Sequence, residues 1–161
     1  MNENNRFLPT YKGCIVCGQK DTNPNTLNVR FRIIEDGVEV PFTPDYRQEG
    51  YKGIVHGGVI TSLLDETIGW AVSVQIKKYF VTAELNIRFV KPLPVGTDVI
   101  VKGRVVEHKS RYSVAAGEIT DAGGIVYARA EGKFVPMSDE HAQNVHKYLT
   151  FQENDVDILN L

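Results

Sequence analysis

The residues best suited to chemistry lie in the sequence GYKGIVHGG of residues 50–58, immediately before the longest mostly apolar stretch of the chain. His56, Gly57 and Gly58 stand at the start of a predicted helix, and Asp65 follows two helical turns later. Backbone N–H groups at a helix N-terminus lack helical partners and carry about half a positive charge, so they stabilise negative charge developing on an oxygen atom. Glycine lets a ligand approach these groups closely. The pattern indicates a site that polarises a carbonyl group beside a carboxylate.

The helix that positions these residues is predicted to run from Gly57 or Gly58 to about Lys77, which gives a length of about 30 Å. At about 100° per residue, apolar and small or polar side chains separate onto two sides. The apolar side comprises Val59, Ile60, Leu63, Thr67, Trp70 and Val74, and the other comprises Gly58, Thr61, Ser62, Asp65, Gly69 and Ser73. We expect a sheet to cover the apolar side and another backbone to approach the small side.

The rest of the chain has the period of β-strands. Residues 27–33 carry apolar side chains at every second position, and Asp36-Gly37 predicts a hairpin to a short strand over 38–42, where Pro41 favours a sheet edge. Further strands are predicted over 81–89, 98–107, 111–120 and 125–135. Adjacent hairpins favour antiparallel pairing. The sequence therefore predicts an α+β fold with five or six antiparallel strands around one long central helix, in a single domain over residues 1–161.

Composition limits the partners that the chain can have. The net charge is −2 and charged residues are interspersed, which argues against nucleic acid or an anionic membrane as a partner. The first residues show no leader pattern, and no stretch reaches the roughly 20 apolar residues of a membrane span. These features lead us to expect a cytoplasmic protein.

Two segments flank the predicted sheet and helix, a lead-in over residues 1–26 and a tail over 137–161. Ser138 is predicted to cap a short helix that reaches Tyr148. The acidic residues that follow, 152–161, have only a weak apolar pattern. We expect them to fray or to pack on a partner.

The order of these features resembles the hotdog-fold acyl-CoA thioesterase superfamily, especially its phenylacetyl-CoA thioesterase type and the human thioesterase superfamily members. The resemblance covers roughly residues 12–136 and rests on HGG with Asp65 seven residues after its second glycine, on T-A-x-L-N-I from Thr82, and on the lead-in C-I-V-C-G-Q. It implies hydrolysis of an acyl- or aryl-CoA to the free acid and CoA, without a cofactor. It also implies homodimers whose sheets join edge to edge, or tetramers built from two dimers.

The resemblance also implies roles for single residues. The N–H of Gly57 would polarise the thioester carbonyl, Asp65 would act as general base or as nucleophile, and Thr82 of the neighbouring subunit would position water. Asp65 would otherwise be a surface carboxylate paired with a basic residue, but no basic residue stands three or four positions later. Thr82 would otherwise reflect β-propensity alone. His56 would support the site by fixing the loop or contacting the ligand, and Gly58 would bind substrate.

Two further positions bear on this assignment. Glu66 is a rival carboxylate, but it points about 100° away from Asp65 around the helix axis, so we do not expect both to serve one carbonyl. Gly50 stands where many members of the phenylacetyl-CoA type have an asparagine that binds the thioester or water. Gln48 and Glu49 are the nearest possible substitutes.

Coenzyme A carries phosphates, for which basic side chains are expected at the mouth of the site. Lys109, Ser110 and Arg111, in a predicted turn, are the candidates, with Arg88 behind them. The alternative is a solvated hairpin turn. We expect the helix and a neighbouring strand to line the acyl pocket.

Cys14 and Cys17 have the spacing of half a tetrahedral zinc site. No second cysteine pair exists, and the four histidines show no ligand spacing. We therefore expect no metal, but reduced cysteines or a disulfide under oxidising conditions.

Two other functions use the same fold. One is a non-catalytic protein that binds acyl-CoA in the same pocket. The other is a hotdog dehydratase or hydratase, whose histidine and acidic residue are arranged differently from the motif around Asp65.

Overall fold

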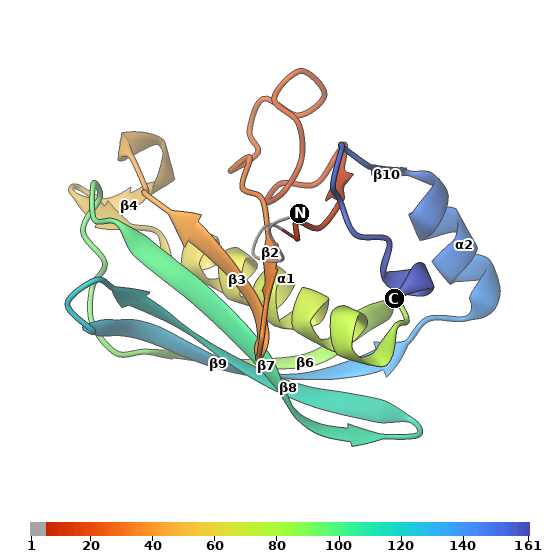
Figure 1. The fold of residues 1–161 in the computed structure, drawn as a ribbon. Helices are drawn as coiled ribbons and strands as arrows, with labels where there is room; N and C mark the ends of the chain where they lie inside the picture. The colour runs from red at the N-terminus through yellow and green to blue at the C-terminus, as the bar shows by residue number, and fades with distance from the viewer. Residues whose placement is uncertain (1–5) are drawn as a thin grey trace.

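The computed structural model describes residues 6–161, in which one long helix, α1 (Gly57–Ile76), lies across a six-stranded antiparallel sheet (Figure 1). The sheet comprises, in spatial order, β2 (Arg32–Ile34), β3 (Gly37–Phe42), β7 (Val99–Lys109), β8 (Tyr112–Asp121), β9 (Val126–Pro136) and β6 (Phe80–Phe89). The predicted α+β class, the helix and the four later strands are confirmed, with bounds that differ by at most two residues. The first five residues of the predicted lead-in lie outside the described residues.

The two strands predicted nearest the N-terminus need correction. The strand predicted over 27–33 joins the sheet only from Arg32, because the preceding backbone bonds to a loop instead: the Leu27 N–H donates to the Ile15 oxygen at 2.7 Å. The strand that contains Pro41 is not at the sheet edge, since β3 lies between β2 and β7. However, β2 reaches only as far as Glu39 of β3, so Pro41 pairs on the β7 side alone.

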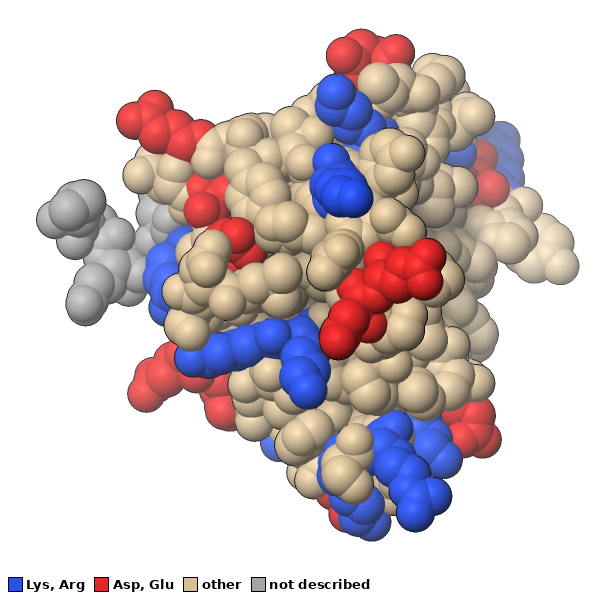
Figure 2. Space-filling model, turned by 90° about the vertical axis from the view of Figure 1, so that its right-hand side faces the viewer, with Lys and Arg blue, Asp and Glu red and all other residues tan. Residues whose placement is uncertain are grey.

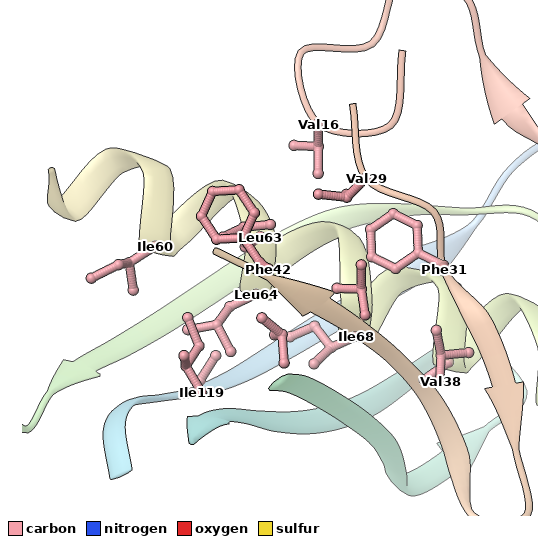
Figure 3. Close-up of a cluster of buried hydrophobic side chains, with 14 of the residues drawn as sticks. Val16, Val29, Phe31, Val38, Phe42, Ile60, Leu63, Leu64, Ile68 and Ile119 are labelled. Carbon is pink, nitrogen blue, oxygen red and sulfur yellow. The ribbon is translucent and has the colours of Figure 1, made fainter. Parts of the chain in front are cut away.

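The core lies between α1 and the sheet. Leu63, Leu64 and Ile68 of the helix are fully buried, and Phe42, Ile119 and other apolar side chains surround them (Figure 3). The apolar side predicted for the helix omitted Leu64 and Ile68, because it was rotated toward Val59, Trp70 and Val74, which are only partly buried.

Three glycines on adjacent strands, Gly103, Gly117 and Gly132, form the surface on which Ile68 rests. A Cβ atom at Gly117 would lie 2.6 Å from the Ile68 Cγ2, and a Cβ atom at Gly103 would lie 3.0 Å from the Ile68 Cα. Real side chains do not fit at such separations, so these glycines let α1 approach the sheet closely.

We expect Gly117→Ala to lower the free energy of unfolding by about 1–3 kcal/mol, because the added methyl group overpacks the contact with Ile68. Urea unfolding followed by circular dichroism measures the change. Gly123→Ala in the exposed β8–β9 turn is the matched control, since its Cβ would meet only the Asp121 side chain. Equal stabilities of Gly117→Ala and wild type would contradict the close packing described here.

The two terminal segments lie side by side (Figure 1). As predicted, Ser138 caps a short helix, α2 (Asp139–Lys147), after which β10 (Leu149–Thr150) pairs with β1 (Thr10–Tyr11). The Val156 N–H donates to the Phe7 oxygen at 2.8 Å, and Ile158 is only 1% exposed. The expectation that the tail frays or packs on a partner is therefore wrong, because the tail packs on the N-terminal segment of its own chain.

Charged groups are dispersed on the face of the molecule at which α2 lies (Figure 2). Basic and acidic side chains are interspersed among uncharged ones there, without a broad field of one sign. None of the helices formed by residues 6–161 has the length and apolar character needed to cross a membrane.

Candidate active site

The N-terminus of α1 presents one unpaired backbone donor. His56 is the N-cap residue, and its Nδ1 accepts a hydrogen bond of 2.8 Å from the Gly58 N–H. The histidine thus fixes the loop, which is one of the two roles that the sequence suggested for His56. Within residues 6–161 the Gly57 N–H has no hydrogen-bond partner. It is therefore free to receive an oxygen atom from a ligand.

A cavity of about 540 Å³ opens beside this donor, and we call it the glycine cavity. Its lining is Gly50, Tyr51, Ile54, Val55, His56, Gly57, Ile60, Phe89, Val90, Lys91, Pro92 and Leu93. Lys91, which the sequence analysis did not single out, is the basic residue of this lining.

Glycine at position 50 has a local packing reason. A Cβ atom there would lie 3.0 Å from the His56 Cα and 3.1 Å from its Cδ2, so a larger residue would displace the histidine. Gln48 and Glu49 do not replace the expected asparagine, because both side chains bond within their own turns. Gln48 Oε1 accepts from the Asp45 N–H at 2.8 Å, and Glu49 Oε1 accepts from the Gly53 N–H at 2.9 Å.

Asp65 lies in a second cavity, of about 230 Å³, which we call the aspartate cavity. Thr82 Oγ1 donates a hydrogen bond of 2.8 Å to Asp65 Oδ1. Both residues belong to one chain, because β6 runs alongside the middle of α1. The expectation that Thr82 faces Asp65 of a neighbouring subunit is therefore wrong.

The walls of the aspartate cavity are mostly apolar and come from distant parts of the chain. They comprise Tyr11, Cys17, Asp65, Glu66, Gly69, Trp70, Ser73, Tyr79, Phe80, Thr82, Phe134, Met137, Val145 and Leu149. Asp65, Gly69 and Ser73 of the small side of α1 line this cavity. The sequence analysis expected only the helix and a strand and missed the terminal segments.

Gly57 and Asp65 do not converge within one chain. Eight helical residues separate them along α1, which amounts to about 12 Å. An attacked carbonyl group needs both its oxygen donor and its base within about 3 Å of the reacting atoms. One chain therefore presents the donor and the carboxylate in two different cavities.

Glu66 also lines the aspartate cavity but is directed at the two cysteines. Its Oε2 lies 3.0 Å from Cys14 Sγ, and burial raises the pKa of Glu66 well above its usual value. The Cys17 thiol and the backbone N–H groups of Cys17 and Val16 donate to Cys14 Sγ, and together with Glu66 they lower the pKa of Cys14 to about 5. Both cysteines are free. The sequence gave no signal for this contact, because 52 positions separate Cys14 from Glu66.

The candidate phosphate-binding residues lie outside both cavities. Arg88 lines a separate hollow on the outer face of the sheet, next to Arg129 of β9, so the structure does not place it behind the turn as expected. Lys109, Ser110 and Arg111 form the β7–β8 turn, where the Lys109 Nζ pairs with Glu107 at 2.9 Å.

The position of this turn is still compatible with a ligand that extends from the aspartate cavity. Ser113, just after the turn, and Thr82 both pair with Phe134 of β9. Two strand spacings, about 10 Å, therefore separate Ser113 from Thr82. The role of the turn in binding phosphates stays a prediction.

Comparison with known proteins gives a consistent set of relatives. A family model described as the thioesterase superfamily matches residues 52–128. A Saccharolobus solfataricus protein named "Putative esterase" is 35% identical over 112 residues, which cover 67% of this chain and 78% of that protein. An acyl-coenzyme A thioesterase of Mus musculus is 31% identical over 62% of this chain and 40% of its own length. A solved thioesterase superfamily protein, 29% identical, superposes with a TM-score of 0.70 over 81% of this chain and 70% of that one.

Proposed function

The chain belongs to the thioesterase superfamily and has its hotdog fold, and from this premise we propose that it is an acyl-CoA thioesterase. The reaction is hydrolysis of an acyl- or aryl-CoA to the free acid and CoA. The observation that carries the proposal is the pair of Asp65 and Thr82 at the wall of a mostly apolar cavity. The name of the mouse relative supports the acyl-CoA class of substrate.

The contacts of Asp65 suit the activation of water. The Thr82 hydroxyl holds one carboxylate oxygen, which leaves the other free to take a proton from water or to attack the carbonyl carbon itself. In either route a carbon–oxygen bond forms, negative charge moves to the thioester oxygen, and the carbon–sulfur bond then breaks. When Asp65 acts as base, the proton that it takes from water passes to the CoA thiolate as the thiolate leaves. When Asp65 acts as nucleophile, the CoA thiolate takes a proton from solvent, and water then hydrolyses the mixed anhydride to release the acid and restore Asp65. The Gly57 N–H is the donor for the transient oxyanion.

The separation of Gly57 from Asp65 leads us to infer that two chains share each site. In this arrangement one copy supplies Gly57 and the other supplies both Asp65 and Thr82. The free edge of β6 offers the contact, since β6 pairs only with β9 and exposes Val81 and Phe89, at 47% and 56%. A twofold axis at this edge would join the two sheets and set the two α1 helices antiparallel. The N-terminus of each helix then approaches the middle of the other.

We predict that two inactive variants complement each other. Asp65→Asn and Gly57→Pro, co-expressed in equal amounts, should form mixed dimers that contain one intact and one doubly defective site. Random pairing makes half of the dimers mixed, so the mixture should recover about a quarter of the wild-type activity. Each variant expressed alone is the control. A mixture no more active than its components would rule out sites shared between chains.

The test of the function itself is a panel of acyl-CoA and aryl-CoA esters with release of the CoA thiol as the signal. Release of the thiol by the wild type, and its loss in Asp65→Asn, would support the proposed thioesterase activity. Calorimetric binding of the esters without thiol release would favour the second candidate, a non-catalytic protein that binds acyl-CoA in the same cavity. This second candidate is favoured by two observations: a binding protein of this kind would have the same fold and would use the same cavity.

A further inference from the structure

Three side chains with metal-binding atoms converge between the N-terminal segment and α1. The Cys14 and Cys17 sulfurs and a Glu66 carboxylate oxygen lie within 4.8 Å of one another. In a tetrahedral zinc site, with Zn–S of about 2.3 Å and Zn–O of about 2.0–2.2 Å, ligand atoms are about 3.5–3.8 Å apart. Small side-chain rotations therefore convert the observed cluster into three corners of a tetrahedron.

The loop that carries the cysteines already has the conformation of a metal-binding turn. The N–H groups of Val16 and Cys17 point at Cys14 Sγ, at 3.2 and 3.4 Å, and the Gly18 N–H donates to the Cys14 oxygen at 3.0 Å. A Cβ atom at Gly18 would lie only 2.2 Å from that oxygen, so the turn needs glycine there. Backbone donors aimed at sulfur stabilise a thiolate, which is the form that binds metals.

No basic group occupies this cluster. Glu66 is half-buried, and within residues 6–161 no lysine, arginine or histidine forms an ion pair with it. A bound metal would ionise both thiols and the carboxyl group, and a divalent cation would offset two of the resulting three negative charges. Sulfur ligands favour zinc over magnesium or calcium.

We propose that Cys14, Cys17 and Glu66 bind one zinc ion, with the fourth position open to the aspartate cavity. Cys17 and Glu66 both line that cavity, so a water molecule in it can complete the tetrahedron. The ion links the cysteine loop to α1 at the residue next to Asp65. Three protein ligands with an open fourth position are typical of zinc sites that hold a water molecule, so the ion would add a bound water to the wall of the aspartate cavity. The binding of zinc itself does not rest on the proposed thioesterase activity.

Metal binding is tested on the full chain, reduced, treated with a chelator and desalted. Zinc titration should give one ion per chain, and cobalt should give the thiolate-to-metal charge-transfer absorption of a sulfur-ligated tetrahedral site, which zinc then abolishes. Cys17→Ser should remove this absorption. Glu66→Gln, which keeps the shape of the side chain, should weaken zinc binding at least about tenfold. Asp65→Asn, a loss of the adjacent carboxylate, is the matched control and should bind zinc as wild type does.

Either of two outcomes overturns the site: binding of less than one zinc per chain, or equal zinc affinity of Glu66→Gln and wild type. If a cysteine variant fails to fold, the wild-type protein still tests whether the cysteines bind zinc. Titration of its thiols with a mercurial should release one zinc ion per two thiols. None of these readouts uses activity, so failure of the zinc site and failure of the thioesterase are distinguishable.

Discussion

Asp65→Asn is expected to lower kcat for acyl-CoA hydrolysis by about 10²–10⁴-fold, the usual contribution of a positioned base. Asparagine has the same shape and keeps an oxygen that accepts from Thr82, but it cannot take a proton from water. Steady-state thiol release from an acyl-CoA substrate measures the effect. KM should change little, because the substitution removes an interaction made in the transition state.

The control for Asp65→Asn is Glu131→Gln, which removes a carboxylate on the outer face of the sheet. Its kcat should match that of wild type. Activity retained by Asp65→Asn would remove this residue from the mechanism.

The two possible roles of Asp65 differ in the fate of its oxygen atoms. A nucleophilic carboxylate forms a mixed anhydride, and when water attacks the Asp65 carbon of that anhydride one Asp65 oxygen leaves with the product acid, whereas a general base gives up no oxygen. Single-turnover hydrolysis in heavy-oxygen water, followed by mass spectrometry of the acid and of the protein, detects this transfer. Unlabelled acid together with label on Asp65 indicates the nucleophile.

Gly57→Pro is expected to lower kcat by about 10²–10³-fold, because proline removes the N–H group that receives the oxyanion. Gly57 is the first residue of α1, a position that proline favours in helices. His56 before it has φ of −62° and ψ of 135°, which a following proline tolerates. The substitution is therefore expected to leave the helix intact.

The control for this substitution is Gly57→Ala, which keeps the N–H group and adds a Cβ atom at the same place. In both variants that atom would lie 3.2 Å from the Phe89 ring, so steric effects are shared. The ratio of kcat between Gly57→Ala and Gly57→Pro therefore measures the contribution of the Gly57 N–H group alone. Equal activities of the two variants would mean that the Gly57 N–H does not stabilise the oxyanion.

The sequence predicted those parts of the fold that local periodicity determines. Helix α1 and strands β6 to β9 follow from apolar spacing and turn residues, and their bounds differ from the predicted ones by at most two residues. The association of Asp65 with Thr82 came from the motif, although the assignment of the two residues to different subunits was wrong. Only coordinates showed that β6 lies beside α1 of the same chain.

Contacts between distant segments were not predictable from these patterns. Nothing in the spacing of Cys14 and Cys17 indicates Glu66, 49 or more positions later, as their neighbour. The tail pattern was too weak to show that Ile158 is buried against the N-terminal segment. Likewise, Leu64 and Ile68 were left out of the buried side because the predicted side was rotated toward Val59, Trp70 and Val74, which are only partly buried.

The origin of the cavity walls has a consequence for how substrate preference can change. Asp65 and Thr82 stand on α1 and β6, whereas Tyr11, Val145 and Leu149 come from the terminal segments. Substitutions in those segments can reshape the aspartate cavity, where we propose that the acyl group binds, without changing α1 or β6. Selectivity for the acyl group can therefore diverge among related chains while the residues at the positions of Asp65 and Thr82 stay the same.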